Sequence, residues 1–108
     1  MMADTNLDST FGALADPTRR AILARLMEGD AGVTEIAAPF DMSLNAVSKH
    51  VKILERAGLV RRDIQGRDHR LSFNQAPLED ITAWISEKRV FWEERLDALD
   101  QYLKRKES

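Results

Sequence analysis

Residues 42–60, with the sequence MSLNAVSKHVKILERAGLV, decide how this chain folds. Ser43 can cap the start of a helix, because its hydroxyl can accept a hydrogen bond from an amide of the first turn. Gly58 can end the same helix, because glycine adopts the left-handed conformation readily. Apolar residues recur at three- and four-residue steps between them, and they are Val47, Val51 and Leu54. The pattern predicts an amphipathic helix with one buried face.

The opposite face of this helix is polar and basic, with Asn45, Ser48, Lys49 and Lys52. Such side chains can form hydrogen bonds with base edges or neutralise phosphates. An isolated helix of this composition is more often an ordinary surface helix. The neighbouring segments therefore have to distinguish a surface helix from a DNA-binding one. Residues 33–40 predict a short helix, and residues 41–43 form a connection of the length found in helix-turn-helix motifs. We therefore interpret the second helix as a DNA recognition helix.

The next segment predicts a β-hairpin, with strands at residues 59–63 and 69–73 around a turn at residues 64–68. A polar hairpin tip could serve solubility alone. Beside a helix-turn-helix it is better interpreted as a wing, whose Arg67 can enter a minor groove while Arg61 and Arg62 contact the DNA backbone. The predicted fold is mainly α with a small β-hairpin, a winged helix-turn-helix in the order α-α-α-α-β-β-α.

The net charge of −2 conceals an uneven distribution. Residues 43–72 contain seven Lys and Arg against three acidic residues, a net charge of +4, which leaves −6 for the rest of the chain. Positive charge is thus concentrated on the predicted recognition helix and wing. This arrangement indicates one DNA-binding face and weak attraction to polyanions elsewhere.

Length and composition limit the other possibilities. A chain of 108 residues, 44% apolar and 31% charged, predicts a single globular domain spanning residues 1–108. It has no apolar run long enough for a membrane span and no signal-peptide pattern, so we expect a cytoplasmic protein that does not contact membranes. The absence of cysteine excludes disulfides and thiolate chemistry. No nucleophile–base pair or phosphate-binding glycine loop is recognisable, so we predict neither an enzyme nor a cofactor.

Two helices precede the motif. The first is predicted at about residues 6–15, with an apolar stripe at Leu7, Phe11 and Leu14. Asp16 and Pro17 then cap and open a second helix. For Arg19 and Arg20 in its first turn, we favour a solvated, ion-paired surface over phosphate contact, since exposed arginines are common.

A last helix is predicted at about residues 78–104. It carries a longer apolar stripe than a domain of this size can bury, so we expect part of it to meet a second chain. The alternative is an intramolecular core stripe, with residues such as Trp84 in the domain's own core. With the first helix, the last helix forms the predicted dimer interface, whose residues are Leu7, Phe11, Leu14, Ile85, Trp92, Leu96, Leu99 and Leu103.

Four segments resemble the ArsR-type (ArsR/SmtB) winged-helix repressors of prokaryotes: residues 11–23, residues 42–54, residues 57–60, and the pair Gly66 and Arg67. The resemblance covers nearly the whole chain. It implies a homodimer, paired through the first and last helices, that binds a palindromic (inverted-repeat) operator and represses transcription until an effector or partner releases it. Residues 91–96 resemble the metal-independent branch, and the resemblance places Ser48 and His50 against the DNA.

Metal-sensing members of that family use cysteines on the helix here placed at residues 34–40, or histidines and carboxylates on the last helix. This chain has no cysteine, and its two histidines are His50 and His69. We therefore predict no metal site, because Asp97 and Asp100 lack a histidine partner. The alternative to a DNA-binding repressor is a winged-helix protein-interaction module. The predicted DNA-binding residues are Ser43, Asn45, Ala46, Ser48, Lys49, His50, Lys52, Arg61, Arg62, Gln65, Arg67 and Arg70.

Overall fold

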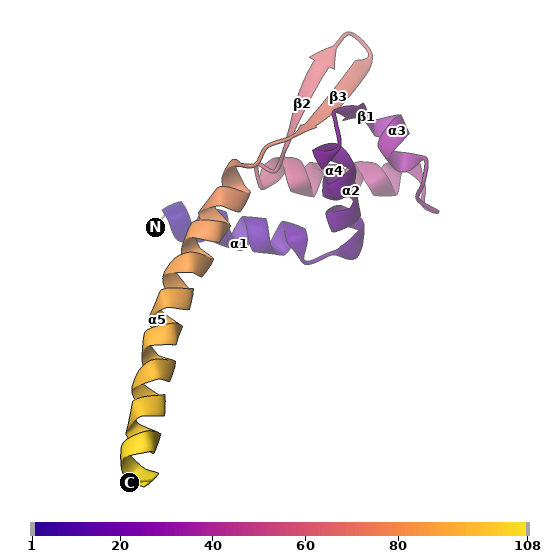
Figure 1. Cartoon of the computed structure of the whole chain (residues 1–108). Coiled ribbons are helices and arrows are strands. Elements are labelled where there is room, and N and C mark those ends of the chain that lie inside the picture. Colours follow the sequence, from indigo (N-terminus) through magenta and orange to yellow (C-terminus); the bar gives the residue numbers. More distant parts are fainter. Residues whose placement is uncertain (1, 108) are drawn as a thin grey trace.

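The computed structural model describes residues 2–107 and is drawn in Figure 1. Its elements in chain order are α1 (Met2–Leu14), α2 (Pro17–Met27), β1 (Ala31–Gly32), α3 (Val33–Ala37), α4 (Leu44–Arg56), β2 (Val60–Gln65), β3 (Asp68–Phe73) and α5 (Ala76–Glu107). Helices dominate, and the β2–β3 hairpin projects beyond them (Figure 1). The predicted winged helix-turn-helix is confirmed, with one additional short strand.

The ends of α2 and α4 are fixed by the predicted caps. Asp16 Oδ2 accepts a hydrogen bond from the Arg19 amide at 3.0 Å, and Pro17 follows at the first helical position. Ser43 Oγ accepts from the Ala46 amide at 3.1 Å. After α4, Gly58 has a φ of 78°, the left-handed conformation expected at the end of a helix. Local capping chemistry therefore fixes the start of the recognition helix and of the helix α2 that precedes the motif.

The apolar faces of α2 and α4 form the centre of the core, to which α3 and the sheet each contribute. The three predicted stripe residues of α4 are completely buried. Around them lie other side chains with an exposed fraction of 2% or less, namely Ile22, Leu23, Leu26, Ile36, Leu59 and Leu71. This core orients α4 so that its polar face is directed outward.

The sheet has the order β1-β3-β2 and is antiparallel throughout. The hairpin is longer than predicted: Gln65 pairs with Asp68, so only Gly66 and Arg67 form the turn. Gly66 has a φ of 63°, as a two-residue hairpin turn requires. Strand β1 was not predicted, because two residues are too few to show an alternating pattern.

The bounds of three helices also differ from the prediction. Helix α1 begins at Met2 rather than near residue 6, and α5 spans Ala76–Glu107 rather than 78–104, because neither glycine nor internal proline interrupts the added turns. Helix α3 ends at Ala37 rather than Phe40. Its early end follows from Pro39, which has no amide hydrogen to donate to the preceding turn.

Helix α5 extends far from the rest of the molecule (Figure 1). The whole molecule, with α5 included, measures 72 × 31 × 21 Å. Its first part lies against α1, where the rings of Phe11 and Trp84 meet edge to face at 6.1 Å. From Thr82 to Lys106 every residue is exposed. No helix among residues 2–107 is long and apolar enough to cross a lipid bilayer. A long apolar stripe thus remains uncovered in the single chain.

Candidate nucleic-acid interface

Helix α4 presents Asn45, Lys49 and Lys52 to solvent, on the side away from its buried stripe. Within the described part of the chain, none of these three side chains has a hydrogen bond or an ion pair. The same is true of Arg61 on β2 and Arg67 at the hairpin turn, both of which are exposed. These donors are available to an external partner, and all but Asn45 are positively charged.

A cavity of about 310 Å³ separates α4 from the wing. It brings Ser48 of the recognition helix and Arg67 of the hairpin turn to the same hollow, together with His69. Thr34 and Leu44 also line it and were not predicted. Leu44 lies directly after the cap residue and is 52% exposed, so it could contact a thymine methyl group. The sequence feature that could have identified Leu44 is its position in the first turn of α4, outside the predicted apolar stripe of that helix.

Arg62 joins the wing to the recognition helix. Its Nη2 donates to Glu55 Oε1 at 2.7 Å, and its Nη1 lies 2.8 Å from His69 Nδ1. Because guanidinium can only donate, His69 Nδ1 must be the acceptor in this pair. The Arg62 side chain is 20% exposed. These contacts hold β2 and β3 against the end of α4, and a phosphate contact by Arg62 would compete with them.

Other predicted DNA-binding residues also have partners within the chain. Arg70 donates to the Asp30 carbonyl at 3.1 Å and lies 3.8 Å from a carboxylate oxygen of Glu35, which attaches β3 to the segment before α3. Gln65 donates to Asp63 at 3.1 Å, and the Ser43 hydroxyl caps α4. Their DNA contacts stay predictions, while their observed bonds shape the surface.

Arg19 corrects one prediction, since it is neither simply solvated nor directed outward. It donates to the carbonyls of Gly12 and Ala13 at the end of α1, at 3.0 and 2.7 Å. Its Nη1 also lies 3.4 Å from Nδ1 of His50 on α4. Arg20 binds the Leu14 carbonyl in the same way, at 2.7 Å. Cations are favoured at a helix C-terminus, so both arginines stabilise the end of α1.

The corner between α1 and α2 also has a shifted carboxyl group. The hydrogen bond from the Arg19 amide holds the pKa of Asp16 below its usual value. Burial opposes this shift, and the nearby His50 and Arg19 charges add to it. His50 Nδ1 lies 3.8 Å from Asp16 Oδ2. His50 is therefore partly buried against α2 as well as being adjacent to the polar face of α4.

Among the side chains of residues 6–106, no three histidines or carboxylates converge as metal ligands would. Instead, the structure combines a recognition helix, a wing and exposed cations. A family model described as a helix-turn-helix domain matches residues 14–63, which span α2 to β2. The chain is 34% identical to the transcriptional repressor SdpR of Bacillus subtilis over 79 residues, which cover 73% of this chain and 88% of SdpR.

Two solved structures are also similar. The crystal structure of the ArsR family transcriptional regulator RHA00566 is 43% identical, with a TM-score of 0.80 over 83% of this chain and 93% of the other. The solution structure of Mb0332 from Mycobacterium bovis, described as a homodimeric winged helix-turn-helix DNA-binding domain, is 26% identical, with a TM-score of 0.61 over 85% and 82%. These relatives are regulators rather than enzymes, as predicted. The chain belongs to the ArsR family of winged-helix transcriptional regulators.

Proposed function

We propose that this regulator is a homodimeric repressor that binds an inverted-repeat operator and is released by a signal other than a metal. The observation that carries the DNA contact is the groove between α4 and the wing, which Ser48 and Arg67 both line. Exposed cations of the same helix and hairpin, among them Lys49 and Arg61, belong to the segment with a net charge of +4. A helix and a hairpin with net positive charge complement a duplex.

The exposure and the hydrogen bonds of each side chain indicate its role in DNA binding. Asn45, Ser48 and Lys49 recognise bases, because Ser48 lines the groove and the other two are exposed polar side chains of the same helix. Arg67, at the tip of the wing, contributes affinity through the minor groove or the phosphates. Other predicted contacts, including those of Arg62 and Arg70, act first by fixing the wing. We include the remaining residues of the predicted DNA-binding set in the same proposal.

A dimer is proposed because one recognition helix contacts only a few base pairs. Two copies related by a two-fold axis can enter successive major grooves roughly 34 Å apart. The exposed stripe of α5, with Trp92, Leu96 and Leu99, supplies an apolar surface for this pairing, together with Leu7 and Phe11 of α1. The similar Mb0332 domain is described as homodimeric. The interface is isologous, so each patch meets its own copy.

The releasing signal is proposed to be non-metallic, because the chain has no thiolate ligand and its two histidines lie in separate contacts with Arg19 and Arg62. Titration of the operator complex with buffered zinc, nickel or cobalt should leave its affinity unchanged. A stoichiometric metal complex that lowers operator affinity would contradict this part of the proposal.

The DNA-binding proposal is tested by selecting bound duplexes from a random pool and measuring affinity against salt. Ser48→Ala or Asn45→Ala should relax the preference at particular operator positions by about 1–3 kcal/mol. Arg67→Ala should weaken all duplexes alike and reduce the salt slope by about one. A wild-type chain whose DNA binding does not depend on salt would instead be a protein-interaction module.

A further inference from the structure

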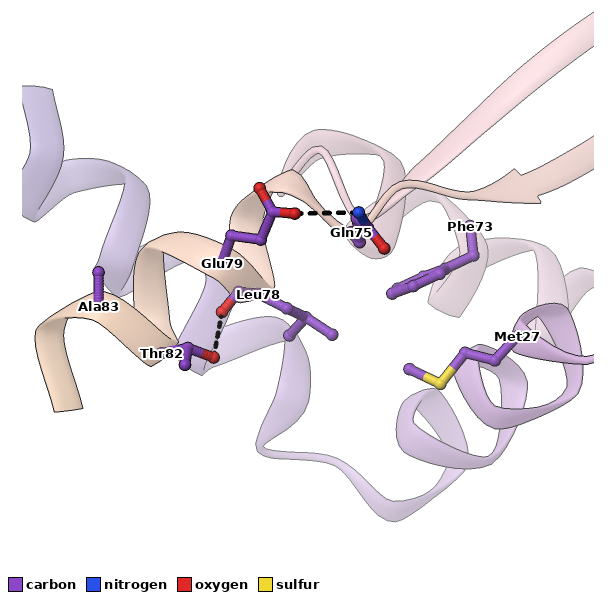
Figure 2. A pocket seen from close by; sticks show the side chains of 7 residues that line it. All are labelled: Met27, Phe73, Gln75, Leu78, Glu79, Thr82 and Ala83. Atoms are coloured by element: carbon purple, nitrogen blue, oxygen red, sulfur yellow. Dashed lines mark hydrogen bonds between the residues drawn. The ribbon is translucent and has the colours of Figure 1, made fainter. Parts of the chain in front are cut away.

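Two hollows border the first turns of α5, and they differ in what they offer a ligand. The larger is a groove of about 520 Å³, on which Met27, Phe73 and Leu78 converge from three elements (Figure 2). Gln75 at this groove already donates to Glu79 Oε1 at 2.9 Å. The groove therefore offers chiefly apolar area and little that would select a polar ligand.

The smaller hollow, which we name the α1–α4–α5 pocket, has a volume of about 270 Å³. Helix α1 contributes Asn6 and Thr10, the end of α4 contributes Arg56, and the first turns of α5 contribute Pro77 and Asp80. The pocket shares no residue with the groove between α4 and the wing. Pockets for drug-sized ligands measure about 300–1,000 Å³, so this one suits a smaller molecule.

Part of the polar wall of this pocket is held by hydrogen bonds within the chain. The buried Thr10 hydroxyl donates to the Asn6 carbonyl at 2.8 Å. Asn74 Nδ2 donates to the Gly58 carbonyl at 2.7 Å, and Asn74 Oδ1 accepts from the Ala76 amide at 3.4 Å. Asn74 thus ties the end of the recognition helix to the start of α5, and the pocket lies at this junction.

Two charged side chains at the pocket have no partner. Arg56 and Asp80 are both exposed, and within residues 6–106 neither side chain has a hydrogen bond or an ion pair, even with the other. A guanidinium can bind a carboxylate through two parallel hydrogen bonds, and a carboxylate can accept hydrogen bonds from an ammonium group. A small molecule that carries both a carboxylate and an ammonium group matches this pair of charges.

A second, more apolar hollow of about 250 Å³ lies beside the pocket, since the two share Arg56 and Ala57. Its other lining residues include Gly12 and Ala13 of α1 and Ile53 of α4. The Ile53 side chain is 38% exposed, so it offers apolar area to a neighbouring group. A ligand held by the two charges has room here for an apolar side chain of its own.

We propose that the α1–α4–α5 pocket binds a free α-amino acid with an apolar side chain. Arg56 binds its carboxylate, and Asp80 binds its ammonium group. Because Arg56 ends the recognition helix, the ligand connects that helix to α5. In this position the amino acid is the releasing signal, and this part of the inference rests on the proposed function. Release requires that the ligand bind the free regulator more tightly than the DNA complex.

Titration of the isotope-labelled chain with each of the standard α-amino acids, followed by nuclear magnetic resonance, tests the pocket. Apolar amino acids should bind most tightly, with a dissociation constant below about 1 mM, and should shift the amide signals of Thr10 and Gly58. The amide of the tightest binder lacks the carboxylate, and its deaminated acid lacks the ammonium group. Each of these two analogues should bind at least about tenfold more weakly.

Arg56→Gln and Asp80→Asn identify the two charges separately. Each should weaken the amino acid at least about tenfold, because one ion pair is lost. Asp80→Asn should not change binding of the deaminated acid, and Arg56→Gln should not change binding of the amide. Arg89→Gln and Asp97→Asn are the matched controls, because both residues are exposed on the distal part of α5. They should bind the amino acid as the wild type does.

The effect on DNA is measured separately with the selected operator. A saturating concentration of the amino acid should raise the dissociation constant of the operator complex at least about fivefold in the wild type and not in Arg56→Gln. An amino acid that binds in the pocket without this effect would overturn its role as the releasing signal.

The remaining outcomes separate this inference from the proposed function. The pocket is wrong if no amino acid binds below about 1 mM, if the shifted amides lie elsewhere, or if both variants bind like the wild type. A chain that binds an amino acid through Arg56 and Asp80 but binds no operator would instead contradict the proposed function and support the pocket.

Discussion

At the scale of single residues, two adjacent arginines of β2 provide an internal comparison. Arg61 is exposed, whereas Arg62 is held by Glu55 and His69. Arg62→Ala should lower the free energy of unfolding by about 1–3 kcal/mol, because a hydrogen-bonded carboxylate loses its partner, and it should leave the salt slope of DNA binding unchanged.

Arg61→Ala is the matched control and should show the reverse. It should reduce the salt slope by about one while the urea midpoint stays where it is. Urea unfolding and salt-dependent operator titrations of both variants make the comparison. A smaller slope without a loss of stability in Arg62→Ala would assign Arg62 to the DNA instead.

Asp16 predicts a pH dependence of stability. Its carboxyl has a lowered pKa in the folded chain, so it stabilises the fold above its ordinary pKa and loses that contribution as the pH falls through the folded value. Asp16→Asn keeps a cap that does not titrate. Near neutral pH the wild type should have a higher urea midpoint than this variant. The difference between the two midpoints should shrink below about pH 4. If the urea midpoints of the two proteins differ by the same amount at every pH from 2 to 7, the ionised Asp16 carboxylate does not stabilise the fold.

The sequence predicted the structural role of a residue where that role depends on near neighbours in the chain. The caps at Asp16 and Ser43 depend on neighbours three residues away, so type and position suffice to predict them. The contacts of Arg19 and Arg62 join separate elements and depend on how those elements pack. For this reason the sequence distinguished neither arginine from its exposed neighbours.

At the scale of elements, the end of α4 depends on the backbone of Gly58, whose φ of 78° is unfavourable for other residues. Gly58→Ala should lower the free energy of unfolding by about 1–2 kcal/mol, because a side chain in this conformation is strained. Gly12→Ala is the control. Gly12 lies within α1, and an added Cβ there meets nothing within 4 Å.

Alanine at Gly12 should therefore stabilise the chain by about 0.5–1 kcal/mol. Thermal or urea unfolding measures both effects. Equal stability of Gly58→Ala and the wild type would show that the connection into β2 adjusts without strain.

Elements long enough for their apolar pattern to repeat were predictable, and very short elements were not. The stripe of α4 repeats often enough to identify a helix, and all three of its apolar residues are buried. Strand β1 has two residues and exists because Ala31 and Gly32 pair with Leu71 and Arg70, which are distant in sequence. The tight turn at Gly66 and Arg67 likewise depends on cross-strand register, which composition alone left open.

At the scale of the whole molecule, the proposed dimer predicts the effect of a charge in the stripe of α5. Leu96 is 60% exposed in the single chain. Leu96→Glu should therefore leave the monomer folded but cost several kcal/mol of dimer stability, since the charge is buried in both copies. Glu94→Ala, on another side of the same helix, should cost almost nothing.

Sedimentation equilibrium and operator binding of the two variants decide this prediction. A Leu96→Glu chain that remains dimeric and binds operator normally would exclude the stripe as the interface. Unfolding of the buried core, which does not include the distal part of α5, should be compared at the same protein concentration, so that a loss of folding is not mistaken for a loss of pairing.

The sequence indicated that α5 carries more apolar surface than a small domain can bury, and the exposed residues of the distal helix agree with that expectation. It could not show the groove beside Met27 and Phe73. That hollow lies where the end of α2, the end of β3 and the first turns of α5 come together, so it depends on the packing of elements distant in sequence.

The distal part of α5 has a consequence for the lifetime of the protein in a cell. A helix without neighbours is marginally stable in water and opens often. Open segments of this kind are preferred sites for proteases, and their cleavage follows the population of the open form. An unpaired chain would therefore be cut in its last helix faster than a paired one. The cell would remove surplus single chains first, and the copies that survive would be those already assembled on one another.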